Sequence, residues 1–272
     1  MLWLVAMPLG NPGDLSPRAR EILSGADAVL VEDTRRAGLV CRRCEVEVRR
    51  FVRFHDHNEE ERSPEIVAWL RKGARLALIS DAGTPIVADP GYRLVRMCRE
   101  AGIRVSVVPG PCAPTTALAG SGIAPLPFTF LGFLPRDATG RQRLFSAFAH
   151  TPGSLVFFER KDRLAASLAD AHVLLGRREL CIARELTKNH EEFIVSSLSD
   201  FAQASVGLLG EITVVIGPAF EKRRTPEAEA RAILGEERER GGRPREMARR
   251  AQARLHGWTS RELYALLAHD AG

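Results

Sequence analysis

Short polar segments rich in glycine and proline interrupt the apolar runs in the first half of this chain. The most informative segment is Ser80 to Pro85, which reads SDAGTP and follows the apolar run Leu76 to Ile79. Gly83 allows a ligand to approach the backbone closely, and the carboxylate of Asp81 accepts hydrogen bonds from hydroxyls or binds a cation. Asp81 is therefore the first candidate ligand-binding residue.

Two further loops have the same character and also follow apolar runs. Residues 7–14 read MPLGNPGD, and residues 109–112 read PGPC. If the three preceding runs are strands of one parallel sheet, the three loops meet at its carboxyl edge, where such sheets bind ligands. Three converging loops suit a ligand with several faces, such as an adenosyl cofactor. The sequence contains neither GxGxxG nor GxxxxGK[ST], so it supports no dinucleotide site or P-loop.

Charged residues after other predicted strands are candidates for catalysis. Glu32 and Asp33 follow the apolar run Ala28 to Val31. Burying two adjacent carboxylates is costly, so we expect them to face a wet crevice or to pair with the arginines at positions 35 and 36. Lys188 can orient a phosphate or form an ion pair with Glu185, and the ion pair is favoured.

Two motifs allow a metal or redox interpretation. His55-Asp56-His57 offers metal ligands or a base near neutral pH, although a lone HxH beside acids is more often a polar loop. Cys41 and Cys44 form a single CxxC, without a second pair or a histidine at the spacing of a zinc finger. We therefore expect no metal site.

The elements that position these residues alternate between strands and helices. The pattern predicts an α/β domain over residues 1–122, a Pro- and Gly-rich linker over 123–136, a second α/β domain over 137–220 and a basic helical tail over 221–272. In the first domain it predicts strands at Leu2 to Ala6, Ala28 to Val31, Val46 to Phe54, Leu76 to Ile79 and Arg104 to Val108. It also predicts helices at Pro17 to Leu23, capped by Ser16, and from Ser63 to Leu70.

Composition limits the class of protein. A chain of 272 residues favours two domains, and no apolar run is long enough for a membrane span. The N-terminus lacks the basic region of a signal peptide, and five scattered cysteines do not form a disulfide framework, so we predict a cytoplasmic protein. The net charge of +5 suits a polyanionic partner. Residues 221–272 carry 12 basic and 9 acidic side chains, which fits RNA binding or a solvated charged helix.

Several motifs together resemble the ribosomal RNA small subunit methyltransferase I family, which has the tetrapyrrole methylase fold. In order along the chain they are LVAMPLGNPGD, EDTRRAG, FHDHNE, ISDAGTPIVADPGYRLVRMCREAGIRVSVVPGPCAPTTALAGSGI, GFLP, FFERKDRL, ARELTK and GEITVVI. The resemblance covers essentially the whole chain, including the tail that ends in SRELYALLA. Met7 and Pro12 depart from the family, which commonly has Thr and Leu at these positions.

The resemblance implies a reaction and a set of contacts. It implies transfer of a methyl group from S-adenosylmethionine to the ribose 2′-oxygen of one cytidine in the decoding region of 16S rRNA, with the small ribosomal subunit as partner. It also implies two α/β domains with the cofactor in the cleft between them, and a homodimer. The implied cofactor contacts are Leu9, Gly10, Asp81, Gly83, Thr84, Cys112, Ala113, Glu159 and Ala183.

The implied reaction requires a group that removes the proton of the ribose hydroxyl. Candidates by residue type and by position at strand ends are Glu32, Asp33, His55, His57, Glu185 and Lys188, of which we select Glu32 and Asp33 with Lys188. RNA contact would come from Arg35, Arg36, Arg42, Arg43 and the tail. Two alternatives remain at this point: a methyltransferase of the same fold that acts on a tetrapyrrole carbon, and a non-catalytic RNA-binding protein.

Overall fold

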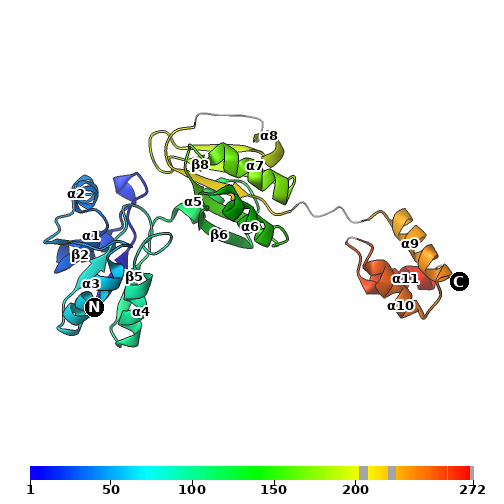
Figure 1. The fold of residues 1–272 in the computed structure, drawn as a ribbon, viewed down its shortest axis with the longest axis horizontal. Helices are drawn as coiled ribbons and strands as arrows, with labels where there is room; N and C mark the ends of the chain where they lie inside the picture. The colour runs from blue at the N-terminus through cyan, green and yellow to red at the C-terminus, as the bar shows by residue number, and fades with distance from the viewer. Residues whose placement is uncertain (202–207, 220–224, 256, 270–272) are drawn as a thin grey trace. The chain divides into compact units, whose positions relative to one another are not determined.

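The computed structural model describes residues 1–201, 208–219, 225–255 and 257–269, and the chain divides into two compact units (Figure 1). The first unit spans Met1–Ala219 and the second spans Phe220–Gly272. The first unit contains two sheets, and the second, which we call the tail unit, is helical.

The first sheet is entirely parallel, with strand order β3-β2-β4-β1-β5 among the described residues. Its strands are β1 (Leu2–Val5), β2 (Ala28–Val31), β3 (Phe51–Arg53), β4 (Leu76–Leu78) and β5 (Val105–Val108). They are connected through η1 (Pro12–Asp14), α1 (Pro17–Gly25), α2 (Thr34–Arg43), α3 (Glu59–Arg71) and α4 (Tyr92–Glu100). Since all five strands run in one direction, the loops that follow them meet at one edge of the sheet.

Helices cover both faces of this sheet, which explains why its three central strands, β2, β4 and β1, are apolar throughout. Helices α1 and α2 pack on one face in a cluster that includes Leu23, Cys41 and Val29. Helices α3 and α4 pack on the other face with Leu30 and Leu78. Alternate residues of one strand therefore serve opposite cores.

Local signals placed several of these elements correctly. Ser16 accepts a hydrogen bond from the Ala19 N–H at 3.1 Å and caps α1, as predicted. Only Phe51–Arg53 of the predicted strand Val46 to Phe54 is a strand, because the Val46 N–H bonds to the Cys41 carbonyl and closes the end of α2. Helix α3 begins at Glu59, four residues before the predicted start.

The second sheet is mixed, with order β6-β7-β10-β8-β9 among the described residues. Strand β6 (Phe128–Phe133) runs parallel to β7 (Ser154–Glu159), while β10 (Ile212–Ile216), β8 (Glu179–Arg184) and β9 (Glu192–Ser197) form antiparallel pairs. Helices α6 (Ala138–Phe148), α7 (Leu164–Leu175) and α8 (Leu198–Phe201) accompany it, and α6 and α7 pack on one face. Helix α5 (Ala113–Gly120) covers the other face.

Two of these elements differ from the predicted domain boundaries. The predicted linker, residues 123–136, contains β6, which pairs with β7 as an edge strand. Its flanking prolines and Gly132, with φ of +68°, obscure the strand pattern in the sequence. Helix α5 was predicted within the first domain, yet its Ala117 and Leu118 pack against Val156 and Val215 of the second sheet. Division of the first unit into two domains stays a prediction.

The tail unit has a core of its own. Helices α9 (Glu227–Glu239), α10 (Pro244–Gln252) and α11 (Ser260–His269) bury an apolar cluster that includes Leu234, Met247 and Leu263. The prediction of helices here is confirmed for the described residues. Positions 221–224, 256 and 270–272 of the predicted tail lie outside them. No helix in the described part of the chain is long and apolar enough to cross a membrane.

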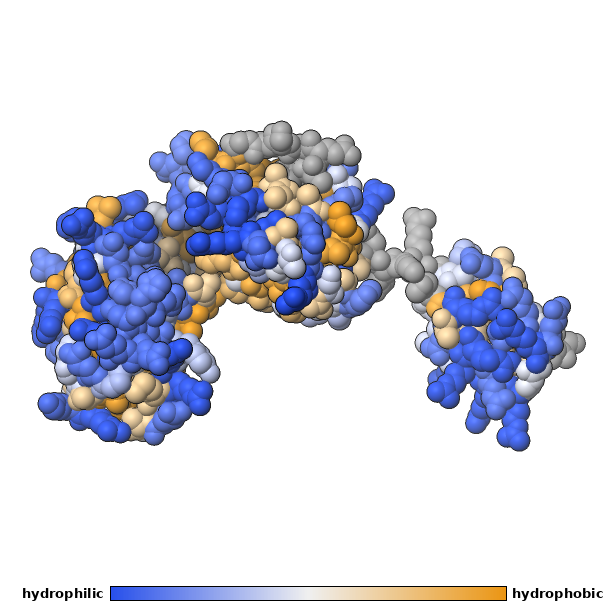
Figure 2. Space-filling model, in the orientation of Figure 1, coloured by the Kyte–Doolittle hydropathy of each residue, from blue (hydrophilic) through white to orange (hydrophobic). Residues whose placement is uncertain are grey.

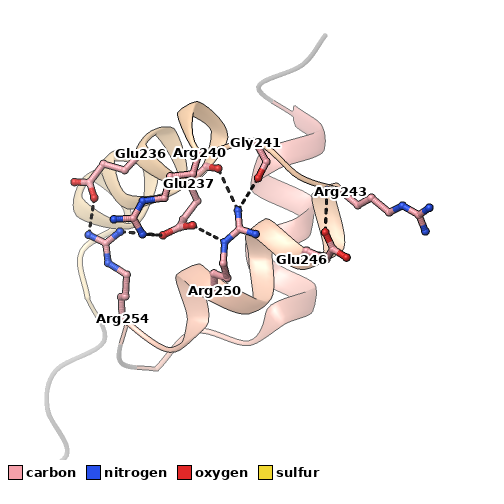
Figure 3. A network of polar contacts seen from close by, with 8 residues as sticks. All are labelled: Glu236, Glu237, Arg240, Gly241, Arg243, Glu246, Arg250 and Arg254. Carbon is pink, nitrogen blue, oxygen red and sulfur yellow. Dashed lines mark hydrogen bonds and ion pairs between the residues drawn. The ribbon is translucent and has the colours of Figure 1, made fainter.

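A buried carboxylate organises the polar side of the tail unit. Glu237 is only 1% exposed, and Arg240, Arg250 and Arg254 all form ion pairs with it at 2.7 to 3.1 Å (Figure 3). Arg250 also donates to the carbonyl of Gly241, where α9 ends. Several of the basic residues in this segment therefore serve to hold its helices together.

Candidate functional site

Hydrogen bonds tie the three Gly- and Pro-rich loops together at the carboxyl edge of the first sheet. The Met7 N–H donates to the Gly83 carbonyl at 2.8 Å, and the Gly83 N–H donates to the Met7 carbonyl at 3.0 Å. The hydroxyl of Thr84 donates to the Pro111 carbonyl at 3.0 Å. The predicted meeting of the three loops is confirmed.

Glycine is needed at two places in this arrangement. Gly83 has φ of +73°, a left-handed conformation that favours glycine. A Cβ on Gly110 would lie 2.9 Å from the Cβ of Ala6, so any larger residue would push the third loop away from the first strand. The close approach of the loops therefore depends on these small residues.

Next to the loops lies a pocket of about 660 Å³, which is within the usual size range of small-molecule sites. The first-sheet loops and the start of α5 contribute residues 9, 32, 81–84, 87–89 and 112–114 to its lining. The second sheet and its loops contribute residues 133, 158–162 and 210–213. The ring centroids of Phe133 and Phe158 lie 5.2 Å apart on this second wall, so the pocket offers aromatic groups as well as carboxylates.

Eight of the residues predicted from the sequence line this pocket. They are Leu9, Glu32, Asp81, Gly83, Thr84, Cys112, Ala113 and Glu159. Four other predicted residues, Gly10, Asp33, Ala183 and Lys188, lie outside its lining. The structure thus brings together most of the implied cofactor contacts, but only one of the three selected catalytic residues.

The positions of Asp33 and Ala183 in the fold explain why these two residues do not line the pocket. Asp33 is the N-cap of α2, where its Oδ1 accepts from the Arg35 N–H at 2.7 Å and from the Arg36 N–H at 3.2 Å. These backbone hydrogen bonds hold the pKa of Asp33 below its ordinary value. Ala183 is fully buried under α5, and it is Thr213, its partner on β10, that lines the pocket.

Lys188 and Gly10 form a contact between the two halves of the first unit. Lys188 donates to Glu185 at 3.0 Å and to Glu211 at 2.9 Å, so the predicted ion pair with Glu185 is confirmed. Burial works against its charge, but the hydrogen bonds to Glu211 and Glu185 prevail and raise the pKa of Lys188. Its aliphatic stem lies so close to Gly10 that a Cβ there would overlap the Lys188 Cγ. Lys188 is thus held beside Gly10 by two ion pairs that favour its charged form.

Most carboxylates of the pocket already have a cation as partner. Asp81 pairs with Arg36 at 3.0 Å, and Asp162 pairs with Arg160 at 3.1 Å. Glu159 turns its carboxylate inward, where it pairs with Arg163 at 2.5 Å and accepts a hydrogen bond from the Ser167 hydroxyl. Glu159 therefore forms part of the pocket wall, with its carboxylate held by Arg163 and Ser167.

Glu32 and Asp89 are the exceptions. Burial, followed by repulsion from Asp81 and Asp56, raises the pKa of Glu32. Burial and then repulsion from Glu32 raise the pKa of Asp89 to about 7. Asp89 was not among the residues predicted from the sequence, although an acidic residue in an Asp-Pro-Gly breaker directly before a helix is a recognisable signal. Phe133, Phe158 and Lys161 were not predicted either, because they have no local signature.

The other sequence candidates do not contribute to the pocket. His55 and His57 follow β3 with ring centroids 6.0 Å apart, and neither lines the pocket. Cys41 and Cys44 are buried and free, and burial raises the pKa of Cys41 to about 11, which makes it a poor nucleophile. In the described residues, no group of three or more His, Cys, Asp or Glu is arranged to hold a metal ion.

Comparison with known proteins identifies a matching protein family and individual relatives within it. The family described as Tetrapyrrole (Corrin/Porphyrin) Methylases matches residues 1–202. The ribosomal RNA small subunit methyltransferase I of Micromonospora olivasterospora is 40% identical over 268 residues, which are 97% of this chain and 83% of that protein. The protein of the same name from Haemophilus influenzae is 36% identical over 275 residues, covering 99% and 97% of the two chains.

Solved structures share the fold at lower identity. The methyltransferase CobJ superposes with a TM-score of 0.62 at 18% identity, covering 82% of this chain and 95% of that chain. Uroporphyrin-III C-methyl transferase from Thermus thermophilus, complexed with S-adenyl homocysteine, gives a TM-score of 0.58 at 21% identity and covers 79% and 96%. The chain belongs to the ribosomal RNA small subunit methyltransferase I family and has the tetrapyrrole methylase fold.

Proposed function

We propose that this chain transfers a methyl group from S-adenosylmethionine to the ribose 2′-oxygen of a cytidine in the decoding region of 16S rRNA. The observation that carries the proposal is the pocket formed by the three tied loops and the second sheet, in a chain whose relatives are named as ribosomal RNA small subunit methyltransferases. The donor's methyl group is already electrophilic when bound, so the chain's own residues must position it and accept a proton.

The residues present fit an adenosyl cofactor. Its purine has flat aromatic faces, which suit the rings of Phe133 and Phe158, while its hydroxyls and positive charges suit the carboxylates of the pocket. Gly83 lets such a ligand lie close to the backbone. We propose that Leu9, Asp81, Gly83, Thr84, Cys112 and Ala113 contact the cofactor. Gly10, Ala183, Lys188 and Glu159 then position these contacts, and Asp33 caps α2.

RNA binding is proposed for two basic surfaces. Arg35, Arg36, Arg42 and Arg43 are exposed on α2, which starts beside the pocket residue Glu32. In the tail unit, Arg245 and Arg249 are exposed on α10 one helical turn apart, and within the described residues neither side chain has an acidic partner. Figure 2 shows the visible face of the tail unit as largely hydrophilic. Such arginines would bind RNA phosphates and make binding dependent on salt.

We also propose that the chain forms a homodimer, and that it acts in the cytoplasm, where small ribosomal subunits are found. The support for the dimer is a set of exposed apolar side chains on or next to β6, namely Leu126, Phe128 and Phe133. Light scattering coupled to gel filtration would give the mass in solution. A monomer at all concentrations would contradict the dimer without affecting the reaction.

The proposed function is tested by labelled-methyl transfer to small ribosomal subunits that lack the modification. The expected product is methyl on a single ribose, mapped by resistance to alkaline cleavage, because a methylated 2′-oxygen cannot attack the neighbouring phosphate. An absence of transfer with the cofactor bound would favour the tetrapyrrole alternative. Failure to bind the cofactor would favour the non-catalytic RNA-binding protein.

A further inference from the structure

The pocket carboxylates divide into two groups according to their partners. Asp81, Glu159, Asp162 and Glu211 each form an ion pair with an arginine or lysine at 2.5 to 3.1 Å. Glu32 and Asp89 line the same pocket, and among the residues that the structure describes neither has a cation within ion-pair distance. A group that must accept a proton cannot be held charged by a cation, so only these two are suited to acid–base chemistry.

Asp89 is also held in a defined place. It ends a loop in which Ile86 and Ala88 have φ of +75° and +70°, values that non-glycine residues adopt at a cost. On one side, Thr84 anchors this loop to Pro111. On the other side, the buried carboxylate of Glu59 accepts from the N–H groups of Arg93 and Leu94 in the first turn of α4, at 2.9 and 3.3 Å. Backbone strain of this kind is typical of sites where a side chain must be aimed.

We propose that Asp89 is the general base that takes the proton of the acceptor ribose hydroxyl, an inference that rests on the proposed methyl transfer. Glu32, from the end of β2, is the neighbouring carboxylate that tunes it. As the O2′–methyl bond forms, the proton passes to an Asp89 oxygen. The carbon–sulfur bond of the donor breaks with its electron pair remaining on sulfur, and the proton then leaves Asp89 for water.

The charges around Asp89 explain why it can serve at neutral pH. Glu32, Asp56 and Asp81 face it from the ends of three strands, while Arg160, Lys161, Asp162 and Glu211 line the opposite wall. Burial and the nearest of these carboxylates, Glu32, raise the pKa of Asp89 to about 7, against a weaker opposite effect of Ser80. A base whose pKa lies near the working pH combines a useful ionised fraction with good proton affinity.

The test compares single-turnover transfer rates on both sides of neutral pH at saturating cofactor. In the wild-type chain the rate should rise with pH and reach half of its plateau near pH 7, as Asp89 ionises. Asp89→Asn should lower the plateau about 100-fold or more and abolish this rise. Glu32→Gln should keep the rise but move its midpoint to lower pH, because a repelling charge has been removed.

Asp56→Asn is the matched control, since it removes an exposed acid of the same rim that lies outside the pocket lining. Its plateau rate should match the wild-type rate, and its midpoint should move to lower pH by less than that of Glu32→Gln, because Asp56 repels Asp89 more weakly than Glu32 does. Calorimetry should show the same cofactor affinity in Asp89→Asn as in the wild-type chain, and loss of cofactor binding would overturn the assignment to proton transfer. Carbon NMR of the free protein provides a measurement that does not need turnover. The wild-type spectrum should contain a carboxyl signal that titrates near pH 7, and this signal should be missing from the spectrum of Asp89→Asn.

The outcomes separate the two proposals. If the wild-type chain methylates RNA and Asp89→Asn does so at the same rate, the assignment of Asp89 is wrong and the proposed function stands. If the wild-type chain transfers nothing, the proposed function fails. In that case, if no carboxyl signal of the wild-type protein titrates near pH 7, the assignment of Asp89 as the general base fails as well.

Discussion

Carboxylates of similar chemistry take different roles in this protein because their partners differ. Asp33 faces the N–H groups of α2, Glu159 faces Arg163 and Ser167, and Asp89 faces other acids. The first two have hydrogen-bond or ion-pair partners, whereas burial and the neighbouring acids raise the pKa of Asp89 to about 7. At the scale of the residue, function follows from the electrostatic environment more than from residue type.

The first prediction contrasts two aspartates of the carboxyl edge. Asp81→Ala should lower the affinity for S-adenosylmethionine about tenfold or more, since a hydrogen bond to a charged group contributes ~1.5–3 kcal/mol. Asp33→Ala should leave the affinity unchanged but lower the midpoint of thermal unfolding, because α2 loses its cap. Calorimetric titration and thermal scanning check both. Equal cofactor affinity in wild type and Asp81→Ala would contradict its role in binding.

The second prediction concerns the cysteines. Cys41, Cys44, Cys98 and Cys181 are buried, whereas Cys112 is half-buried and lines the pocket. A native alkylation experiment read by mass spectrometry should therefore modify Cys112 first, and S-adenosylmethionine should slow that modification. Cys112→Ser serves as the control for the site of labelling. Faster modification of Cys41 or Cys44 would show that the α2 core opens more readily than the pocket.

At the scale of the element, the pocket depends on how loops of the first sheet meet the second half of the unit. The Asn11 N–H donates to the Thr187 hydroxyl at 3.1 Å, and the Lys188 stem lies on Gly10. These contacts join segments that are more than 170 residues apart in the chain. The loops are thus positioned by tertiary contacts as well as by their own turns.

Gly10→Ala tests this junction. The added methyl group should displace Lys188, weaken its ion pairs with Glu185 and Glu211, and reduce cofactor affinity several-fold. Gly25→Ala is the control, since a methyl group at this end of α1 would meet no atom of the described residues within 4 Å. Calorimetry should show normal affinity in this control. Normal affinity in Gly10→Ala would mean that the junction adapts without cost to the pocket.

The Glu237 network makes the tail unit sensitive to acid. Hydrogen bonds from Arg250 and Arg254 prevail over burial and hold the pKa of Glu237 below its ordinary value. Its contribution to stability is therefore complete above the ordinary pKa of a glutamate and is lost as the pH falls through the lower, folded-state pKa. Glu237→Gln should unfold the tail unit at lower temperature and remove this acid-dependent loss.

The indole N–H of Trp258, which donates to the Thr225 carbonyl at 2.7 Å, is a local NMR reporter for that experiment. Glu236→Gln is the control, because Glu236 is half-exposed and pairs only at the edge of the network. A larger effect of Glu236→Gln than of Glu237→Gln would contradict the central position of Glu237.

At the scale of the whole molecule, the proposed RNA binding depends on where the basic side chains lie. Arg245→Gln with Arg249→Gln should weaken RNA binding, and the slope of log affinity against log salt should fall by about 0.7–0.9 for each phosphate that the double variant no longer neutralises. Arg71→Gln with Arg104→Gln changes the net charge equally at the other edge of the first sheet, next to the starts of β4 and β5. Equal reductions in affinity in both double variants would mean that only net charge matters.

The sequence by itself determined the α/β alternation, most strand positions, the Ser16 cap and the three loops of the site. These features depend on apolar runs, on caps and on Gly-Pro breakers, all of which act over a few neighbouring residues. The same local patterns determined the helical character of the tail and, through the motif series, the family.

Only the tertiary structure decided which carboxylates remain without a cation, where α5 packs, and that β6 is an edge strand. It placed Asp33 at the cap of α2 and Lys188 between Glu185 and Glu211, both outside the pocket lining, and brought Asp89 into the pocket. The physical reason is that a pKa or an ion pair depends on groups that the fold brings together from distant parts of the chain. Sequence periodicity carries no information about such partners.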